Sequence, residues 1–277
     1  MKQPIQFSKM HGLGNDFIVI DAISQEIDLT TAQIQMLADR HFGIGFDQLL
    51  LIEKPTQDDV DFRYRIFNAN GGEVEQCGNG IRCFARFVHD KGLTDKNEIA
   101  VETQGGTVYP RIEPDGLVSV NMGTPDFDPA TLPFNARQQP SYRLKAATQL
   151  VTIGAVSMGN PHAVMVVDEI SRAPIDTLGP AISHHQDFPN QVNTGFMQIL
   201  DPSHIRLRVF ERGAGETLAC GTGACAAVAV GIMWNRLGKE VRVDLPGGQL
   251  LIRWENPNDA LWMTGPATHV FEGTIEL

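Results

Sequence analysis

The chain has 277 residues, of which 42 % are hydrophobic, and it carries a formal net charge of −11 at pH 7. This length allows one large domain or two of about 140 residues. The acidic balance argues against a nucleic acid or an anionic membrane as partner, because either would require a basic face. The first nine residues lack the apolar core of a secretion signal, and the longest apolar run, residues 224–234, is too short to span a membrane. We therefore expect a soluble cytoplasmic protein.

Short apolar runs predict strands in the first part of the chain, and a helix follows Cys77. The apolar positions after Cys77 recur at helical spacing up to Gly92, a residue typical of the position just beyond a helix end. The strands are predicted at 17–20, 49–52 and 64–67, and the apolar helix positions are Ile81, Phe84, Ala85 and Val88.

The second part of the chain repeats this pattern. Strands are predicted at 164–167, 197–200 and 207–210, and a helix at 224–235 that ends near Gly238. This helix is apolar on nearly all sides. We therefore expect it to run through the middle of a strand-rich unit rather than along its surface.

The two parts are an internal duplication. The stretch CGNGIRC at 77–83 returns as CGTGAC at 220–225, with the first cysteines 220 − 77 = 143 residues apart. The dipeptides Gly105-Gly106 and Gly14-Asn15 return in the second half at nearly the same offset, as Gly247-Gly248 and Gly159-Asn160. At the offset of 143, Arg63, Arg65, Phe67, Gly72 and Glu73 match Arg206, Arg208, Phe210, Gly215 and Glu216.

The duplication predicts the fold class and the division of the chain. We expect an α/β (α+β) fold of two similar strand-rich halves, each wrapped around a central helix, with the active site in the cleft between them. A Gly/Pro/Asp cluster near 121–125 marks the boundary. The first half is predicted at 1–121, completed by 266–277, and the second at 122–265.

The repeated cysteines are the candidate chemical groups. Each follows a predicted strand and a short loop and precedes a predicted helix, so each thiol is expected at a helix N-terminus. Unpaired N–H groups and the helix dipole there lower a thiol pKa and form a carboxylate site. Cys83 and Cys225 do not align in the repeat and are interpreted as core residues. Zinc is the main alternative, but C-x5-C and C-x4-C differ from the usual zinc spacings.

One thiol supplied by each half suits one reaction in particular. Inverting a carbon that bears hydrogen requires a base on one face and an acid on the other. Cys77 and Cys220 can exchange these roles, one as thiolate and one as thiol. The alternative interpretation, two buried cysteines acting as small apolar residues, does not require the glycines that flank them.

These motifs, together with HGLGNDF at 11–17 and GNPH at 159–162, resemble diaminopimelate epimerase over the whole chain. The resemblance implies cofactor-independent epimerisation of LL-diaminopimelate to the meso isomer, for lysine and peptidoglycan synthesis, and a homodimer. It implies Cys77 and Cys220 as catalytic residues, with the α-carboxylate on the backbones of Gly78-Asn79 and Gly221-Thr222. By resemblance, the substrate is also lined by Asn15, Gln48, Asn68, Asn160 and Asn193.

The two halves differ where an asymmetric amino acid must be recognised. Asn68 is replaced by Glu211, which can pair with the α-ammonium, and Ala69 by Arg212, which can hold the distal carboxylate. His162, with Glu211, is expected to bias the two thiols toward one thiolate and one thiol. No metal site is expected, and no lysine lies in a context that indicates a PLP Schiff base.

The nearest rival function is a proline or hydroxyproline racemase of the same architecture, which also uses two cysteines. Such an enzyme needs no second-carboxylate grip, so Arg212 favours diaminopimelate. From a different class, a non-catalytic zinc or redox protein would be revealed by bound metal.

Overall fold

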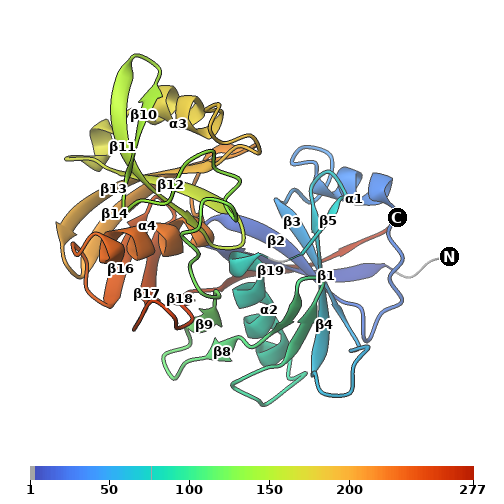
Figure 1. Cartoon of the computed structure of the whole chain (residues 1–277). Coiled ribbons are helices and arrows are strands. Elements are labelled where there is room, and N and C mark those ends of the chain that lie inside the picture. Colours follow the sequence, from blue (N-terminus) through green and yellow to red (C-terminus); the bar gives the residue numbers. More distant parts are fainter. Residues whose placement is uncertain (1–3, 76) are drawn as a thin grey trace. The chain divides into compact units, whose positions relative to one another are not determined.

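The computed structural model describes residues 4–75 and 77–277. The chain forms two compact units, Met1–Val120 with Gly265–Leu277, and Asn121–Thr264 (Figure 1). Among the described residues, no helix is long and apolar enough to cross a membrane.

In the first unit a mixed sheet lies against helix α2 (Gly78–Asp90). The strand order of this sheet is β19-β1-β2-β3-β4-β6-β7, with β5 paired to β4; β8 and β9 pair with each other but are not part of it. A second helix, α1 (Thr31–Ala38), follows β2. The strands are β1 (Ile5–Gly12), β2 (Asn15–Asp21), β3 (Gln48–Glu53), β4 (Phe62–Asn68), β5 (Glu73–Val74), β6 (Val101–Thr103), β7 (Gly106–Val108), β8 (Arg111–Ile112), β9 (Val118–Asn121) and β19 (Thr268–Ile275).

In the second unit the order is β10-β11-β12-β13-β14-β16-β17-β18, with β15 paired to β14. Helix α4 (Gly221–Met233) packs against β11, β12, β13, β14 and β17. A 3-10 turn, η1 (Ile170–Arg172), and helix α3 (Ile175–Ser183) connect β12 to β13. The strands are β10 (Tyr142–Ala146), β11 (Gln149–Ser157), β12 (Pro161–Val166), β13 (Asn193–Asp201), β14 (His204–Glu211), β15 (Gly215–Thr217), β16 (Glu240–Leu245), β17 (Gly248–Arg253) and β18 (Trp262–Gly265).

The two sheets repeat one topology. Along the first sheet, antiparallel and parallel pairs alternate in the order β1–β2, β2–β3, β3–β4, β4–β6 and β6–β7, starting and ending with an antiparallel pair. The second sheet has the same alternation in the order β11–β12, β12–β13, β13–β14, β14–β16 and β16–β17. The predicted fold class is confirmed: two strand-rich sheets with few helices. Five of the six predicted strands lie within β2, β3, β4, β13 and β14, and the sixth, 164–167, extends one residue beyond the end of β12 at Val166.

Both long helices end in the same hydrogen-bond pattern, with the chain turning at a left-handed residue. In α2 that residue is Gly92 (φ +66°), as predicted, and Leu93 N–H donates to the carbonyl of Val88. Helix α4 ends at Met233, earlier than predicted. There Asn235 (φ 56°) takes the turning position, a role that asparagine tolerates better than most residues.

An ion pair that occurs in both units stabilises the short hairpin before each cysteine, β4–β5 in the first unit and β14–β15 in the second. Arg65 donates through Nε and Nη2 to the two carboxylate oxygens of Glu73, at 2.8 Å each. In the second unit Arg208 makes the same fork with Glu216, at 2.6 and 2.8 Å. Such two-pronged contacts fix geometry as well as adding energy. Both cysteines are thus preceded by a hairpin held in the same way.

Candidate active site

Cys77 and Cys220 each lie at the N-cap of a helix. Their backbones are extended (φ −143° and −117°), and their carbonyls accept the first helical hydrogen bonds, from Ile81 and Ala224, at 2.9 Å in each case. The prediction that both thiols lie at helix N-termini is confirmed. The first backbone N–H groups of α2 and α4 lie beside these thiols, an arrangement suited to an anion.

The second glycine of each Cys-Gly-x-Gly motif lets the helix lie close to its sheet. A Cβ on Gly80 would meet the Tyr64 hydroxyl at 2.6 Å, and one on Gly223 would meet Val209 Cγ2 at 2.9 Å and the sulfur of Cys220 at 3.1 Å. Real Cβ atoms essentially never come within 3.0 Å of such atoms, and a contact at 3.1 Å is tighter than nine in ten that occur. The glycines therefore set the depth at which each thiol lies against its sheet.

In the first unit the Cys77 thiol lies beside the amide of Asn15, at the start of β2. Cys77 Sγ donates to Asn15 Oδ1 over 3.7 Å, and Asn79 Nδ2 donates to the same oxygen over 3.2 Å. Across β3 and β4, Gln48 Nε2 donates to Asn68 Oδ1 at 2.8 Å, and Gln48 Oε1 is buried without a hydrogen-bond partner among the residues that the structure describes. The predicted residues Asn15, Cys77 and Asn79 form one contact group, and Gln48 and Asn68 form a second.

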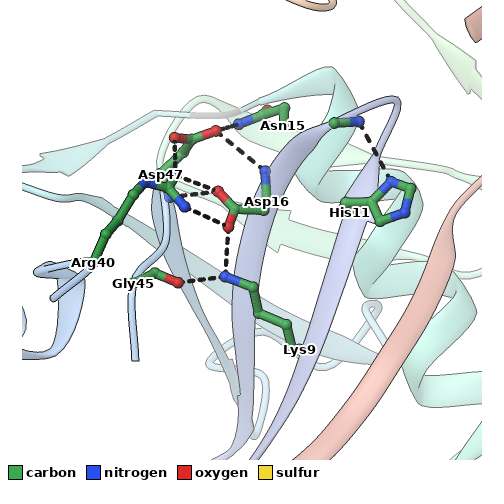
Figure 2. A network of polar contacts seen from close by, with 8 residues as sticks. Lys9, His11, Asn15, Asp16, Arg40, Gly45 and Asp47 are labelled. Carbon is green, nitrogen blue, oxygen red and sulfur yellow. Dashed lines mark hydrogen bonds and ion pairs between the residues drawn. The ribbon is translucent and has the colours of Figure 1, made fainter. Parts of the chain in front are cut away.

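Three residues that sequence reasoning did not assign border this group. Arg82 is fully buried in α2 and donates to Gly78 O, Asn79 Oδ1 and Pro266 O over 3.0–3.2 Å. Asp47 accepts from Asn15 Nδ2 at 2.9 Å (Figure 2). The third is Tyr64, fully buried in β4 close to Cys77.

A signal for two of these residues was present in the sequence. Arg82 is a cation placed between two apolar residues, Ile81 and Cys83, and Asp47 is an acid directly before Gln48 at a strand start. Nothing in the sequence distinguished Tyr64 from an ordinary core aromatic residue.

In the second unit the Cys220 thiol is buried between a carboxylate and a hydroxyl. Its sulfur lies 3.6 Å from Thr222 Oγ1, and Asn160 Nδ2 donates to the same hydroxyl oxygen over 3.3 Å. Glu211 accepts from Thr217 Oγ1 at 2.5 Å and also hydrogen-bonds the thiol. The predicted residues Asn160, Glu211, Cys220 and Thr222 therefore form one group.

The expectation of a lowered thiol pKa is wrong for Cys220 in this structure. Burial raises the pKa of the Cys220 thiol well above its usual value, and the Glu211 carboxylate raises it further. The Thr222 side chain and the Gly223 backbone N–H lower it, but they do not outweigh burial. The helix N-terminus therefore acts against a larger desolvation effect.

His162 is buried and neutral at physiological pH. Burial, and then the positive charge of Arg212, lower its pKa from 6.5 to about 3. Its Nε2 lies 3.0 Å from Asn160 Oδ1. Because Asn160 Nδ2 is directed to Thr222, that oxygen accepts and His162 Nε2 carries the proton.

The remaining predicted residues, Asn193 and Arg212, are in contact with each other. Asn193 is buried and pairs with His162 across β12 and β13, and its Oδ1 accepts the backbone N–H of Arg212 at 3.0 Å. The exposed Arg212 guanidinium donates to Asn190 O at 3.3 Å. Most of its donors therefore remain available to an anion.

The other two cysteines lie in the core. Cys83 and Cys225 are both 0 % exposed, and burial raises the pKa of Cys83 to about 12. The interpretation of Cys83 and Cys225 as core residues is confirmed. Within residues 4–75 and 77–277, no three His, Cys, Asp or Glu side chains group in a way that could hold a metal ion.

Comparison with known proteins gives a family. The family model for diaminopimelate epimerase matches residues 7–127 and 154–270. The chain is 60 % identical over 274 residues to the diaminopimelate epimerase of Nitrosospira multiformis, and 61 % identical over 277 residues to that of Azoarcus sp. strain BH72, covering 99 % of both chains in each case. A solved hydroxyproline epimerase from Agrobacterium vitis shares the fold, with a TM-score of 0.71 at 14 % identity over 99 % of this chain and 93 % of the other. The chain belongs to the diaminopimelate epimerase family.

Proposed function

We propose that the chain epimerises LL-2,6-diaminopimelate to meso-diaminopimelate without a cofactor, in the synthesis of lysine and of peptidoglycan precursors. One observation carries the proposal: two helix-capping thiols, Cys77 and Cys220, stand at equivalent places in a duplicated fold. The family membership and the 60 % identity to relatives named for this activity support it.

The reaction requires one group to remove the α-proton and another to deliver a proton to the opposite face. Cys77 and Cys220 take these roles, and they exchange them when the reaction reverses. A proton leaves the carbon for one thiolate, the electron pair remains on the α-carbon, and the other thiol gives up its proton to that carbon. The thiolate left behind is the base for the reverse reaction.

The carbanion is stabilised where its charge spreads into the α-carboxylate. The backbones of Gly78-Asn79 and Gly221-Thr222, at the first turns of α2 and α4, would receive that carboxylate. Helix N-termini favour negative charge and present N–H donors, and fixed donors of this kind cost no reorganisation during the reaction.

The substrate would be recognised mainly by residues of the second half that have no identical counterpart in the first half. Glu211 takes the α-ammonium, and Arg212 holds the distal carboxylate with a planar fork. The exposure of the Arg212 guanidinium, which donates one hydrogen bond to Asn190 O, supports this role. The amides of Asn15, Gln48, Asn68, Asn160 and Asn193 would line the rest of the site.

His162 and Glu211 would make the two thiols unequal. Glu211 opposes ionisation of Cys220 by its negative charge. His162 acts as a neutral donor that holds Asn160 toward Thr222. Binding of an ammonium beside Glu211 would offset its effect and favour the Cys220 thiolate at the moment when a base is needed.

The alternative hypothesis, a proline or hydroxyproline racemase, is supported by the fold alone. The Agrobacterium vitis hydroxyproline epimerase has the same architecture at only 14 % identity. A proline-type substrate has no distal carboxylate to engage Arg212. Turnover of L-proline faster than LL-diaminopimelate would favour the rival.

The mechanism is tested by hydrogen exchange in heavy water at less than a tenth of conversion. A thiol holds a single proton, so early product should carry deuterium while unreacted substrate stays almost unlabelled. Unlabelled early product would show that one group removes and returns the same proton. Cys77→Ala and Cys220→Ala should each abolish turnover, and more than a tenth of wild-type activity in either variant would exclude paired roles.

We further propose that the enzyme works in the cytoplasm as a homodimer. Strand β19 is the edge of its sheet and exposes Val270 (52 %) and Phe271 (46 %), and an exposed apolar edge favours pairing. Light scattering should give twice the chain mass, and Val270→Lys should lower it. A monomer in the wild type would refute the dimer.

A further inference from the structure

We propose that Asp47 is a positioning residue: it holds the side-chain amide of Asn15 so that the amide oxygen, and not the nitrogen, faces the Cys77 thiol. An amide oxygen only accepts, so this orientation favours the protonated form of Cys77 in the free enzyme. The inference rests on the proposed function of Cys77, and it adds a residue and a direction to it.

The Asn15 amide is bound on both sides. Its Nδ2 donates to Asp47 Oδ2 at 2.9 Å, and its Oδ1 accepts from Asn79 Nδ2 at 3.2 Å and from Cys77 Sγ at 3.7 Å. Arg82 Nη2 in turn donates to Asn79 Oδ1 at 3.0 Å. The donors therefore all run one way, from Arg82 through Asn79 and Asn15 to Asp47.

The two ends of this relay determine its direction. A carboxylate can only accept and a guanidinium can only donate. Turning the Asn15 amide over would place its oxygen against the Asp47 carboxylate, and turning Asn79 over would place its nitrogen against the Arg82 guanidinium. Neither amide can therefore reverse while Asp47 and Arg82 are in place.

Asp47 is itself held by a charged cluster (Figure 2). Arg40 Nη2 donates to Asp47 Oδ1 at 2.7 Å, and the Asp16 N–H donates to Asp47 Oδ2 at 3.2 Å. Arg40 also forks onto the Asp16 carboxylate, and Lys9 binds both that carboxylate and Gly45 O. Although burial alone would raise it, hydrogen bonds from Arg40 and Lys9 lower the pKa of Asp16 to about 2.

The second unit provides a natural contrast. The pairs β2–β3 and β12–β13 align Phe17 with Gln48 and His162 with Asn193, so Val192 occupies the place of Asp47. There the equivalent amide, Asn160, has the opposite polarity, with its nitrogen toward Thr222 and its oxygen toward His162. Where the carboxylate is absent, the amide is reversed.

Two other titratable groups of the first unit lie close enough to Cys77 to affect its charge. Tyr64 of β4 and Cys83 of α2 interact electrostatically with it, and burial raises the pKa of both, that of Cys83 to about 12. Arg82 remains charged throughout. Between pH 5 and 9, a changed reactivity of Cys77 would therefore report on Asn15 rather than on these neighbours.

The test measures the alkylation of Cys77 by iodoacetamide from pH 5 to 9, by mass spectrometry of its peptide, in the full chain carrying Cys220→Ala. Because a thiolate is the reactive form, Asp47→Asn should raise the rate at pH 7 about fivefold and shift the pH profile about 0.7 unit lower. The Asp47 side chain is 44 % exposed, so water competes for it, and a larger shift is not expected.

Two comparisons separate positioning from general loosening. Arg40→Gln removes a partner of Asp47 but keeps the Asp47–Asn15 hydrogen bond, so it should lower stability and leave the alkylation profile in place. In an Asn15→Ala background, Asp47→Asn should have no further effect on the rate, because the two residues act in series.

Three outcomes would overturn the inference: an Asp47→Asn profile that overlays its parent, the same shift in Arg40→Gln, or an undiminished shift in the Asn15→Ala background. If Asp47→Asn folds poorly, the double variant Asp47→Asn, Arg40→Gln can replace it, because it removes both charges of the Asp47–Arg40 ion pair and leaves neither one unpaired. The double variant should show the alkylation profile expected for Asp47→Asn. The readout needs no substrate, so failure of the proposed epimerase activity in a separate assay is distinguishable from failure of this inference.

Discussion

Acid should destabilise the second unit through His162, and His162→Gln should reduce that sensitivity. A glutamine can place an amide N–H where the imidazole Nε2 donates to Asn160 Oδ1, but it does not titrate. The variant therefore keeps the contact and removes the proton-binding site.

The magnitude follows from the two pKa values of His162. In the unfolded chain the imidazole titrates near 6.5, and in the folded protein burial lowers this to about 3. As the pH falls below 6.5, the unfolded state binds a proton that the folded state does not bind, so the free energy of unfolding decreases. Between pH 7 and pH 5, linkage gives a loss of about 2 kcal/mol from this residue.

The assay is urea unfolding at pH 7 and pH 5, followed by tryptophan fluorescence. All three tryptophans, Trp234, Trp254 and Trp262, lie in Asn121–Thr264, so the signal reports the unit that contains His162. The wild type should lose about 2 kcal/mol more than His162→Gln over this pH range. Equal losses in the two proteins would refute a buried, neutral His162.

Three further outcomes are expected. Gly80→Ala should destabilise the protein by roughly 1–3 kcal/mol and lower turnover, because its Cβ would meet the Tyr64 hydroxyl at 2.6 Å. The control is Gly105→Ala, whose Cβ would make only ordinary contacts beyond 3.5 Å, and equal melting temperatures of the two variants would contradict the prediction. Cys83→Ala should cost roughly 1–2 kcal/mol in urea unfolding and leave kcat nearly unchanged, and a loss of kcat without loss of stability would instead give this thiol a chemical role. Arg212→Lys keeps the charge without the planar fork and should reduce kcat/KM for LL-diaminopimelate about 30-fold, with L-lysine a poor substrate before and after; an unchanged kcat/KM would remove Arg212 from substrate recognition.

Local structure was predictable from the sequence because the duplication presents each signal twice. A strand, a short loop and Cys-Gly-x-Gly before an apolar run occur at 77 and again at 220, and both cysteines are helix N-caps. The nearly all-apolar composition of α4 correctly indicated a buried helix, and every residue from Gly223 to Gly231 is buried. Both of its ends were placed wrongly: the helix begins at Gly221 rather than Ala224, and Asn235 provides the left-handed turn that was assigned near Gly238.

The electrostatics of the site could not be predicted in the same way. A helix N-terminus is visible in a sequence, but the depth of a thiol beneath the surface is not, and burial decides the direction of the pKa shift at Cys220. The contact between Asp47 and Asn15 likewise depends on the parallel pairing of β2 with β3, which brings together residues 32 positions apart. No local pattern marks such a contact.

The burial of α4 also limits how the second unit can open. A Cβ on Gly154 would lie 2.5 Å from Val230, and one on Gly231 would lie 2.2 Å from Leu237, so strand β11 and the chain after α4 fit the helix with no spare room. A segment enclosed in this way exchanges its amide hydrogens with solvent mainly through unfolding of the whole unit. The middle of α4 should therefore be among the slowest-exchanging parts of the protein, and Cys220 stands at the end of that protected helix, where its position depends little on local fluctuation.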